Sequence, residues 1–174
     1  AAFVAAGNRS YYGIETDIHQ TGDGKFVLIH DSETGRVAGE NLTVEKTPLS
    51  RLRELILPDH AGQPRFDLRL PVPEEYLHIC RDYDKVAVLE LKAPFSDETL
   101  REIRALVQAH HSEENTVYIS FFYENLTALR RMDDSLKLQF LCGGADDLNE
   151  ERMQDMAKNR IGADAYYAIL NEEK

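Results

Sequence analysis

The chain has 174 residues, of which 43% are hydrophobic and 29% are charged, with 10 glycines and 6 prolines. This composition is typical of a globular protein and argues against fibrous, collagen-like and disordered classes. Its 31 acidic and 20 basic residues give a formal net charge of −11, which argues against nucleic acids and anionic membranes as partners.

Two further features of the composition bear on location. No run of about 18 apolar residues occurs, so we expect no transmembrane segment. Cys80 and Cys142 are too few for a disulfide scaffold or a zinc cluster, and we expect both to be free thiols. The first residues hold no basic leader before an apolar stretch. We therefore expect a cytoplasmic protein.

The first third of the chain predicts a hairpin followed by an irregular stretch. Residues 1–9 read as the end of a helix, and residues 13–19 alternate as a strand does. A turn signal at 21–24 leads into a second strand at 26–30. Residues 31–72 exceed the about 2–6 residues of a typical connection between strand and helix, so we expect an inserted loop or small segment. It should hold one short helix near residues 48–57, capped by Thr47.

After residue 72, predicted helices and strands alternate with short connections. We expect helices at 73–83, 96–111, 124–132 and 148–158, and strands at 85–92, 116–120, 136–141 and 165–170. This alternation predicts a parallel α/β fold, within a single domain that spans residues 1–174. The sheet could be open and doubly wound or closed as a barrel, and periodicity alone does not choose between them.

Acidic side chains recur at strand ends. Residues two apart share a face of a strand, so Glu15 and Asp17 point the same way, as do Glu90 and Lys92. Three carboxylates that converge inside an α/β fold need compensation, and a divalent cation is the simplest. Oxygen ligands without cysteine favour Mg²⁺ or Ca²⁺, with Mn²⁺ possible. The alternative is that these residues face solvent or form structural salt bridges.

His30 ends the second predicted strand. If Asp23 and Gly24 form a two-residue hairpin loop, His30 lies opposite Asp17. A histidine beside a carboxylate cluster suits general acid or base catalysis near neutral pH. A histidine that ends a strand is otherwise a structural or surface residue. Gly143 and Gly144 indicate either a phosphate-cradling turn or a plain loop.

These motifs resemble the glycerophosphodiester phosphodiesterase family. That family carries Glu-x-Asp followed by Thr-x-Asp-Gly-x-x-Val-x-x-His-Asp, and later an Ile-Glu-x-Lys strand and a Ser-Phe pair. The residues at matching positions here are Glu15, Asp17, Thr21, Asp23, Gly24, Val27, His30, Asp31, Glu90, Lys92, Ser120 and Phe121. The resemblance extends over most of the chain.

The resemblance implies a (β/α)8 TIM-type barrel and a metal-dependent enzyme of lipid metabolism. Glu15, Asp17 and Glu90 would then hold the divalent ion, and Lys92 would contact the phosphate. His30 would be one of two histidines that act as general acid and base. The substrate would be a glycerophosphodiester, cleaved to glycerol 3-phosphate and an alcohol.

The chain also departs from the family pattern. The His-Arg-Gly strand that precedes the first helix is absent, and five barrel strands are predicted where eight are needed. We therefore expect a partial barrel without the first and last strands, one that is inactive by itself. Two alternatives stay open: a phospholipase D-like lipid phosphodiesterase on the same barrel, and a non-catalytic metal-binding fragment.

Overall fold

The computed structural model describes residues 1–59 and 61–167. The chain divides into two compact units, Ala1–Val86 and Ala87–Lys174. In the part that the structure describes, none of the helices has the length and apolarity that crossing a membrane requires. The prediction of a single domain with residues 31–72 as an insertion stays a prediction.

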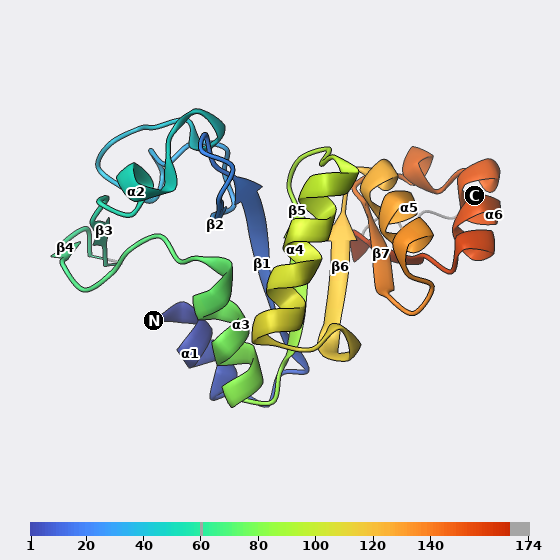
Figure 1. Cartoon of the computed structure of the whole chain (residues 1–174), viewed down its shortest axis with the longest axis horizontal. Coiled ribbons are helices and arrows are strands. Elements are labelled where there is room, and N and C mark those ends of the chain that lie inside the picture. Colours follow the sequence, from blue (N-terminus) through green and yellow to red (C-terminus); the bar gives the residue numbers. More distant parts are fainter. Residues whose placement is uncertain (60, 168–174) are drawn as a thin grey trace. The chain divides into compact units, whose positions relative to one another are not determined.

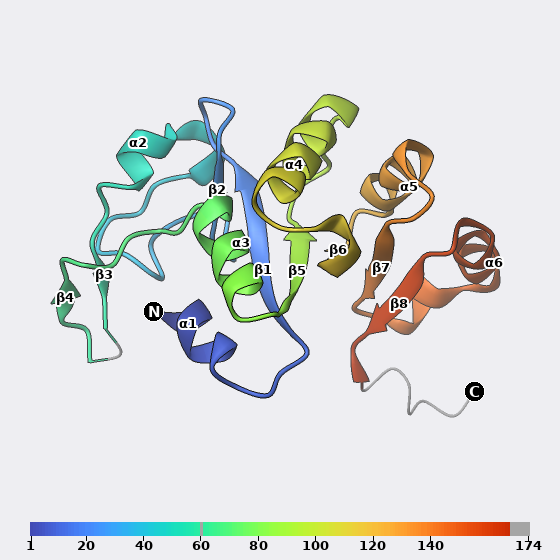
Figure 2. The ribbon, with the colours of Figure 1, turned by 60° about the horizontal axis from the view of Figure 1, so that its bottom comes forward.

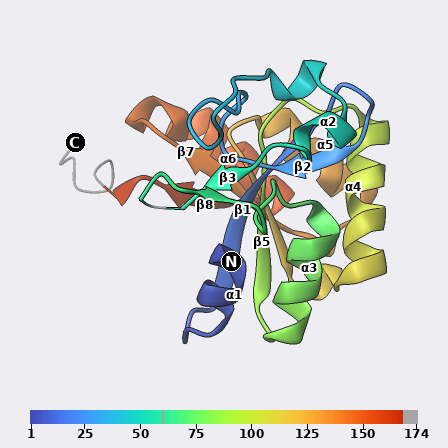
Figure 3. The same ribbon diagram turned by 90° about the vertical axis from the view of Figure 1, so that its left-hand side faces the viewer.

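The first unit combines a hairpin, two helices that pack together and an irregular segment (Figure 1). Its elements are α1 (Ala2–Gly7), β1 (Gly13–Gln20), β2 (Phe26–Leu28), the 3-10 helix η1 (Val44–Lys46), α2 (Leu49–Leu52), β3 (Leu57–Pro58), β4 (Pro64–Arg65) and α3 (Pro73–Asp82). Figure 3 shows α1 beside α3. The two helices meet where the rings of Phe3 and Tyr76 lie 5.0 Å apart, and the Tyr76 hydroxyl donates to the Ile14 carbonyl at 2.6 Å.

The hairpin forms as predicted, but its register differs by one residue. The Ile29 N–H donates to the Asp17 carbonyl at 3.1 Å, so Ile29 rather than His30 lies opposite Asp17. The loop is longer than the predicted two residues, because the Thr21 N–H donates to the Lys25 carbonyl at 2.8 Å. The expected position of His30 across from Asp17 is therefore wrong.

Side chains of the turn explain the longer loop and also cap the next helix. The Thr21 hydroxyl donates to Asp23 Oδ1 at 2.6 Å, and the same oxygen accepts from the Leu49 N–H at 3.0 Å. These hydrogen bonds hold the pKa of the Asp23 carboxyl below its ordinary value. Thr47, predicted to cap α2, instead donates its hydroxyl to the Thr43 carbonyl. The helix is also shorter than predicted and ends at Leu52.

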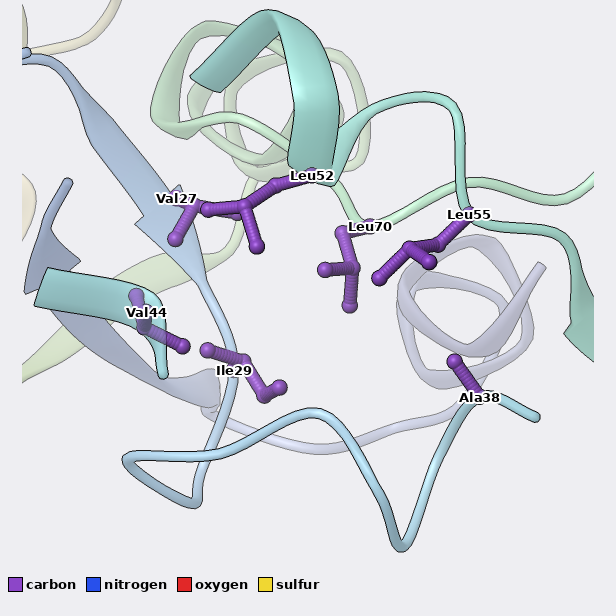
Figure 4. Close-up of a cluster of buried hydrophobic side chains, with 7 residues drawn as sticks. All are labelled: Val27, Ile29, Ala38, Val44, Leu52, Leu55 and Leu70. Carbon is purple, nitrogen blue, oxygen red and sulfur yellow. The ribbon is translucent and has the colours of Figure 1, made fainter. Parts of the chain in front are cut away.

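A hydrophobic cluster joins the irregular segment to β2 (Figure 4). Val27 and Ile29 come from β2 and its continuation. The other five members belong to residues 31–72: Ala38, Val44, Leu52, Leu55 and Leu70. The side chain of Arg53 binds the Leu70 carbonyl and both oxygens of Glu75, and it thus fastens the end of the segment to α3. Residues 31–72 therefore pack as a small core against the hairpin.

The second unit alternates strands and helices. Its elements are β5 (Val86–Leu91), α4 (Asp97–His110), the 3-10 helix η2 (Glu113–Asn115), β6 (Thr116–Ser120), α5 (Tyr123–Met132), β7 (Lys137–Cys142), the 3-10 helix η3 (Ala145–Leu148), α6 (Glu150–Asn159) and β8 (Gly162–Ala165). Strands β5 to β8 pair in chain order, all parallel, as β6, β7 and β8 in Figure 2 illustrate. All five residues of β6 are buried, as expected for a strand covered on both faces. The predicted parallel α/β arrangement is confirmed.

The last strand begins earlier than predicted. Strand β8 is Gly162–Ala165, whereas the apolar run pointed to residues 165–170, of which 168–170 lie outside the described residues. Helix α6 ends at Asn159, its C-cap residue Arg160 has a left-handed backbone (φ 52°), and Ile161 is buried directly after it. The chain thus turns back toward β7 before the apolar run begins.

Candidate functional site

Strand β1 presents its two acidic residues on one face. Ile14, Thr16 and Ile18 are buried, whereas Glu15 is exposed and Asp17 is half-buried. This alternation confirms that the carboxylates of Glu15 and Asp17 share a face. Carboxylates on the same side of a strand repel each other, and a cation between them would relieve the repulsion.

His30 is oriented by its neighbour in the sequence. Its Nδ1 atom lies 2.6 Å from Asp31 Oδ1, and Arg36 Nε donates to Asp31 Oδ2 at 2.6 Å. Arg36 and, second, His30 hold the pKa of the Asp31 carboxyl well below its ordinary value. An ionised carboxylate only accepts hydrogen bonds, so Nδ1 of His30 carries a proton. Proton exchange with a substrate then falls to Nε2, on a ring that is 64% exposed.

The pattern predicted His30 but not its partners. Asp31 follows His30 directly, yet adjacency in the sequence does not tell whether two side chains point toward each other. Arg36 lies five residues further on, within a stretch without periodicity. The adjacent His-Asp pair was the only signal in the sequence for this arrangement.

Strand β5 carries the second pair of candidate residues. Lys92 Nζ lies 2.9 Å from Glu90 Oε1, and the two side chains are only 16% and 11% exposed. Leu89 and Leu91 point to the opposite face and are buried. The prediction that Glu90 and Lys92 share a face is confirmed. At such low exposure, the attraction between the ammonium and the carboxylate offsets part of the cost of burying the two charges.

The glycine pair after β7 is a closed loop. The N–H groups of Gly143 and Gly144 both donate to Asp147 Oδ2, each at 2.9 Å. The chain's own carboxylate therefore takes the two donors that a phosphate cradle would need. Of the two interpretations of this pair, the structure favours the plain loop.

Each unit thus arranges its own part of the predicted site. In the first unit, Glu15 and Asp17 share a face of β1, and His30 is held by Asp31. In the second unit, Glu90 and Lys92 form an ion pair at the end of β5. Glu90 and Lys92 lie at the C-terminal end of β5, which is where α/β barrels place their active sites. Glu15 and Asp17 lie nearer the start and the middle of the longer strand β1.

Comparison with known proteins identifies the family. The model of the glycerophosphoryl diester phosphodiesterase family matches residues 1–173. The chain belongs to this family. A "Glycerophosphodiester phosphodiesterase" from Caldanaerobacter subterraneus subsp. tengcongensis is 29% identical over 150 residues, which cover 82% of this chain and 60% of that protein. This family member thus spans less than two thirds of the length of its curated relative.

Solved structures show the fold. A phosphodiesterase from Oleispira antarctica, in complex with the product sn-glycerol-3-phosphate, superposes with a TM-score of 0.82 at 19% identity, over 97% of this chain and 68% of that chain. A glycerophosphodiester phosphodiesterase described as putative, from Galdieria sulphuraria, gives a TM-score of 0.80 at 20% identity and the same coverage. The fold is therefore α/β and corresponds to part of a (β/α)8 TIM-type barrel, as predicted.

Proposed function

We propose that this chain contributes catalytic residues to an enzyme that hydrolyses glycerophosphodiesters to glycerol 3-phosphate and an alcohol. The observation that carries the proposal is the family match over residues 1–173. The phosphodiesterase from Oleispira antarctica was solved with its product sn-glycerol-3-phosphate, which supports the same substrate class. The His30–Asp31 and Glu90–Lys92 pairs give the chemistry a local basis.

The proposal includes one divalent cation, Mg²⁺ or Ca²⁺, with Mn²⁺ as an acceptable substitute. We assign Glu15 and Asp17 of β1 and Glu90 of β5 as its ligands. Their donors are all carboxylate oxygens, which suit hard cations, and no cysteine is among them. When bound, such an ion neutralises and polarises phosphoryl oxygens.

The remaining roles belong to protein side chains. The Lys92 ammonium binds a non-bridging phosphate oxygen and exchanges part of its contact with Glu90 for the substrate. Nε2 of His30 takes a proton from the attacking hydroxyl or gives one to the departing alcohol, because Nδ1 is held by Asp31. Asp31 fixes the ring and stabilises its protonated form.

The test is release of glycerol 3-phosphate from glycerophosphocholine, with Mg²⁺, with Ca²⁺ or with EDTA. It compares this chain with a version extended at both ends to the length of the relatives. In the extended version, we expect turnover that EDTA abolishes. Glu15→Ala and His30→Ala should each lower its rate about 10²-fold or more. Asp134→Ala, an exposed residue of a surface ion pair, is the control that should stay fully active. Turnover that persists in EDTA would contradict the proposed role of the metal ion. An extended protein that folds and binds the ion but releases no glycerol 3-phosphate would contradict the proposed substrate class.

A further inference from the structure

Two polar side chains of the second unit are completely buried where β6 ends and α5 begins. Ser120 is the last residue of β6 and Asn125 lies in the first turn of α5, and both are 0% exposed. Burying an amide or a hydroxyl is unfavourable unless its hydrogen bonds are made. The partners of these two groups therefore show what the groups are for.

Asn125 uses its whole amide group. Its Oδ1 accepts from the Phe95 N–H at 2.9 Å, and its Nδ2 donates to the Ala93 carbonyl at 2.7 Å and to Ser120 Oγ at 3.3 Å. The reversed orientation of the amide would place oxygen against the Ala93 carbonyl, so only one orientation fits. Asn125 thus clamps the chain at two points after β5.

Ser120 completes the network. Its hydroxyl donates to the Leu91 carbonyl at 2.8 Å and accepts from the Phe122 N–H at 3.0 Å. The carbonyls of Leu91 and Ala93 flank Lys92 in the sequence. The backbone on both sides of Lys92 is therefore fixed by buried side chains from β6 and α5.

Lys92 needs such support. A lysine ammonium sits on a flexible four-carbon stem, so its position depends on how firmly its backbone and its carboxylate partner are held. The ion pair with Glu90 holds the Lys92 ammonium, with Nζ 2.9 Å from Oε1. The hydrogen-bond network of Ser120 and Asn125 holds the backbone from which the Lys92 side chain extends. A leucine at position 125 would fill the same space and suit a helix better, yet it would make none of these hydrogen bonds.

We propose that Asn125, together with Ser120, is a positioning residue that holds Lys92 in place to bind phosphate. The inference rests on the proposed function for the role of Lys92. Asn125 touches neither Lys92 nor substrate in this proposal. It acts through the backbone of residues 91–95.

The decisive variant is Asn125→Leu, which keeps the volume and removes all three hydrogen bonds. Its matched control is Leu129→Ala on the same helix, a buried site that bonds to nothing in residues 91–95. Two readouts are compared in the folded proteins: the order of the Lys92 side chain by NMR, and the dissociation constant for inorganic phosphate. A purely structural role would lower the unfolding temperature in both variants and leave both readouts unchanged.

We expect Asn125→Leu to disorder Lys92 and to weaken phosphate binding about tenfold. Leu129→Ala should change phosphate affinity by less than about twofold, although it is destabilised. Asn125→Ser, in which a hydroxyl replaces the amide, serves if the leucine variant does not fold and should give an intermediate effect. An ordered Lys92 in the folded variant would overturn the inference. If the unmodified chain binds no phosphate, the proposed role of Lys92 fails, while the order of Lys92 still decides the role of Asn125.

Discussion

The carboxylate of Asp31 serves two partners at once, His30 on one oxygen and Arg36 on the other. Arg36 keeps this carboxyl ionised far into the acid range, so its titration does not contribute to a change in rate between about pH 5 and 8. Asp31 therefore fixes the proton on Nδ1 of His30 throughout the range in which the enzyme would work.

We expect Asp31→Asn to lower kcat about 10- to 100-fold while KM changes little. The amide can present a donor or an acceptor to Nδ1, so His30 loses both its fixed tautomer and the charge that stabilises its protonated form. Hydrolysis of glycerophosphocholine by the extended protein, measured across pH 5–9, checks this. Arg36→Gln is the control, because it leaves the carboxylate in place and should have a smaller effect. An unchanged kcat in Asp31→Asn would exclude this role.

Single residues also show which parts of the candidate site the sequence pattern could predict. The period-two repeat was enough to place Glu15 with Asp17, and Glu90 with Lys92, because strand geometry alone decides which side chains share a face. No pattern could foresee the role of Asn125, because two of its three partners lie about 30 residues earlier in the chain. Contacts of that kind depend on how the elements pack, and this information is spread over the whole sequence.

Among the elements, the end of α5 depends on one buried cation. Arg130 is 8% exposed, and its guanidinium donates to five backbone carbonyls. They belong to Asp133, Asp134, Leu136, Asn159 and Arg160. Its side chain thus joins α5, the start of β7 and the end of α6. Burial lowers the pKa of this guanidinium below its ordinary value.

We expect Arg130→Lys to lower the free energy of unfolding by about 2–4 kcal/mol, because an ammonium group cannot reach carbonyls on three elements and leaves some of them unsatisfied. Arg160→Lys is the matched control. Its ion pair with Asp134 is on the surface, and the change should cost less than about 0.5 kcal/mol. Urea denaturation measures both. Equal effects of the two variants would show that the buried hydrogen bonds contribute little.

The elements themselves were largely foreseen from periodicity, and the errors have local causes. Strand β6 has the predicted bounds: its five residues are all buried, and they directly follow the polar residues 113–115. The hairpin register was wrong because hydrogen bonds of Thr21 and Asp23 lengthen the loop. Helix α2 ends early, because after Arg53 the N–H groups of Glu54 and Leu55 donate to carbonyls three rather than four residues back.

For the molecule as a whole, the excess of acidic groups makes behaviour at low pH informative. The second unit contains a half-buried network in which Arg104 binds Glu113 and Asp133. Burial pulls the pKa of Glu113 upward, but hydrogen bonds from Arg104 and Gln108 outweigh it, and the pKa lies below its ordinary value. A lowered pKa in the folded state means that the stabilisation is present above the unfolded pKa of about 4.5 and is lost as pH falls below it.

We therefore expect Glu113→Gln to destabilise the protein at pH 7 and to make little difference at pH 3. Thermal unfolding of both proteins between pH 3 and 7 checks this, and the gap between their unfolding temperatures should close as pH falls below about 4.5. Glu114→Gln, one residue further along the same 3-10 helix, is the control. A gap that stays constant with pH would mean that the charge of Glu113 contributes nothing.

Residues 31–72 are longer than a typical connection between strand and helix, and on length alone the segment would seem dispensable. Five of the seven buried side chains in the hydrophobic cluster around β2 come from this segment. Replacing it with a short linker would expose Val27 and Ile29 and loosen the strand that leads into His30. The segment should thus tolerate changes of sequence on its outer surface but not its removal. We therefore expect versions of this protein that lack the segment to be insoluble on expression.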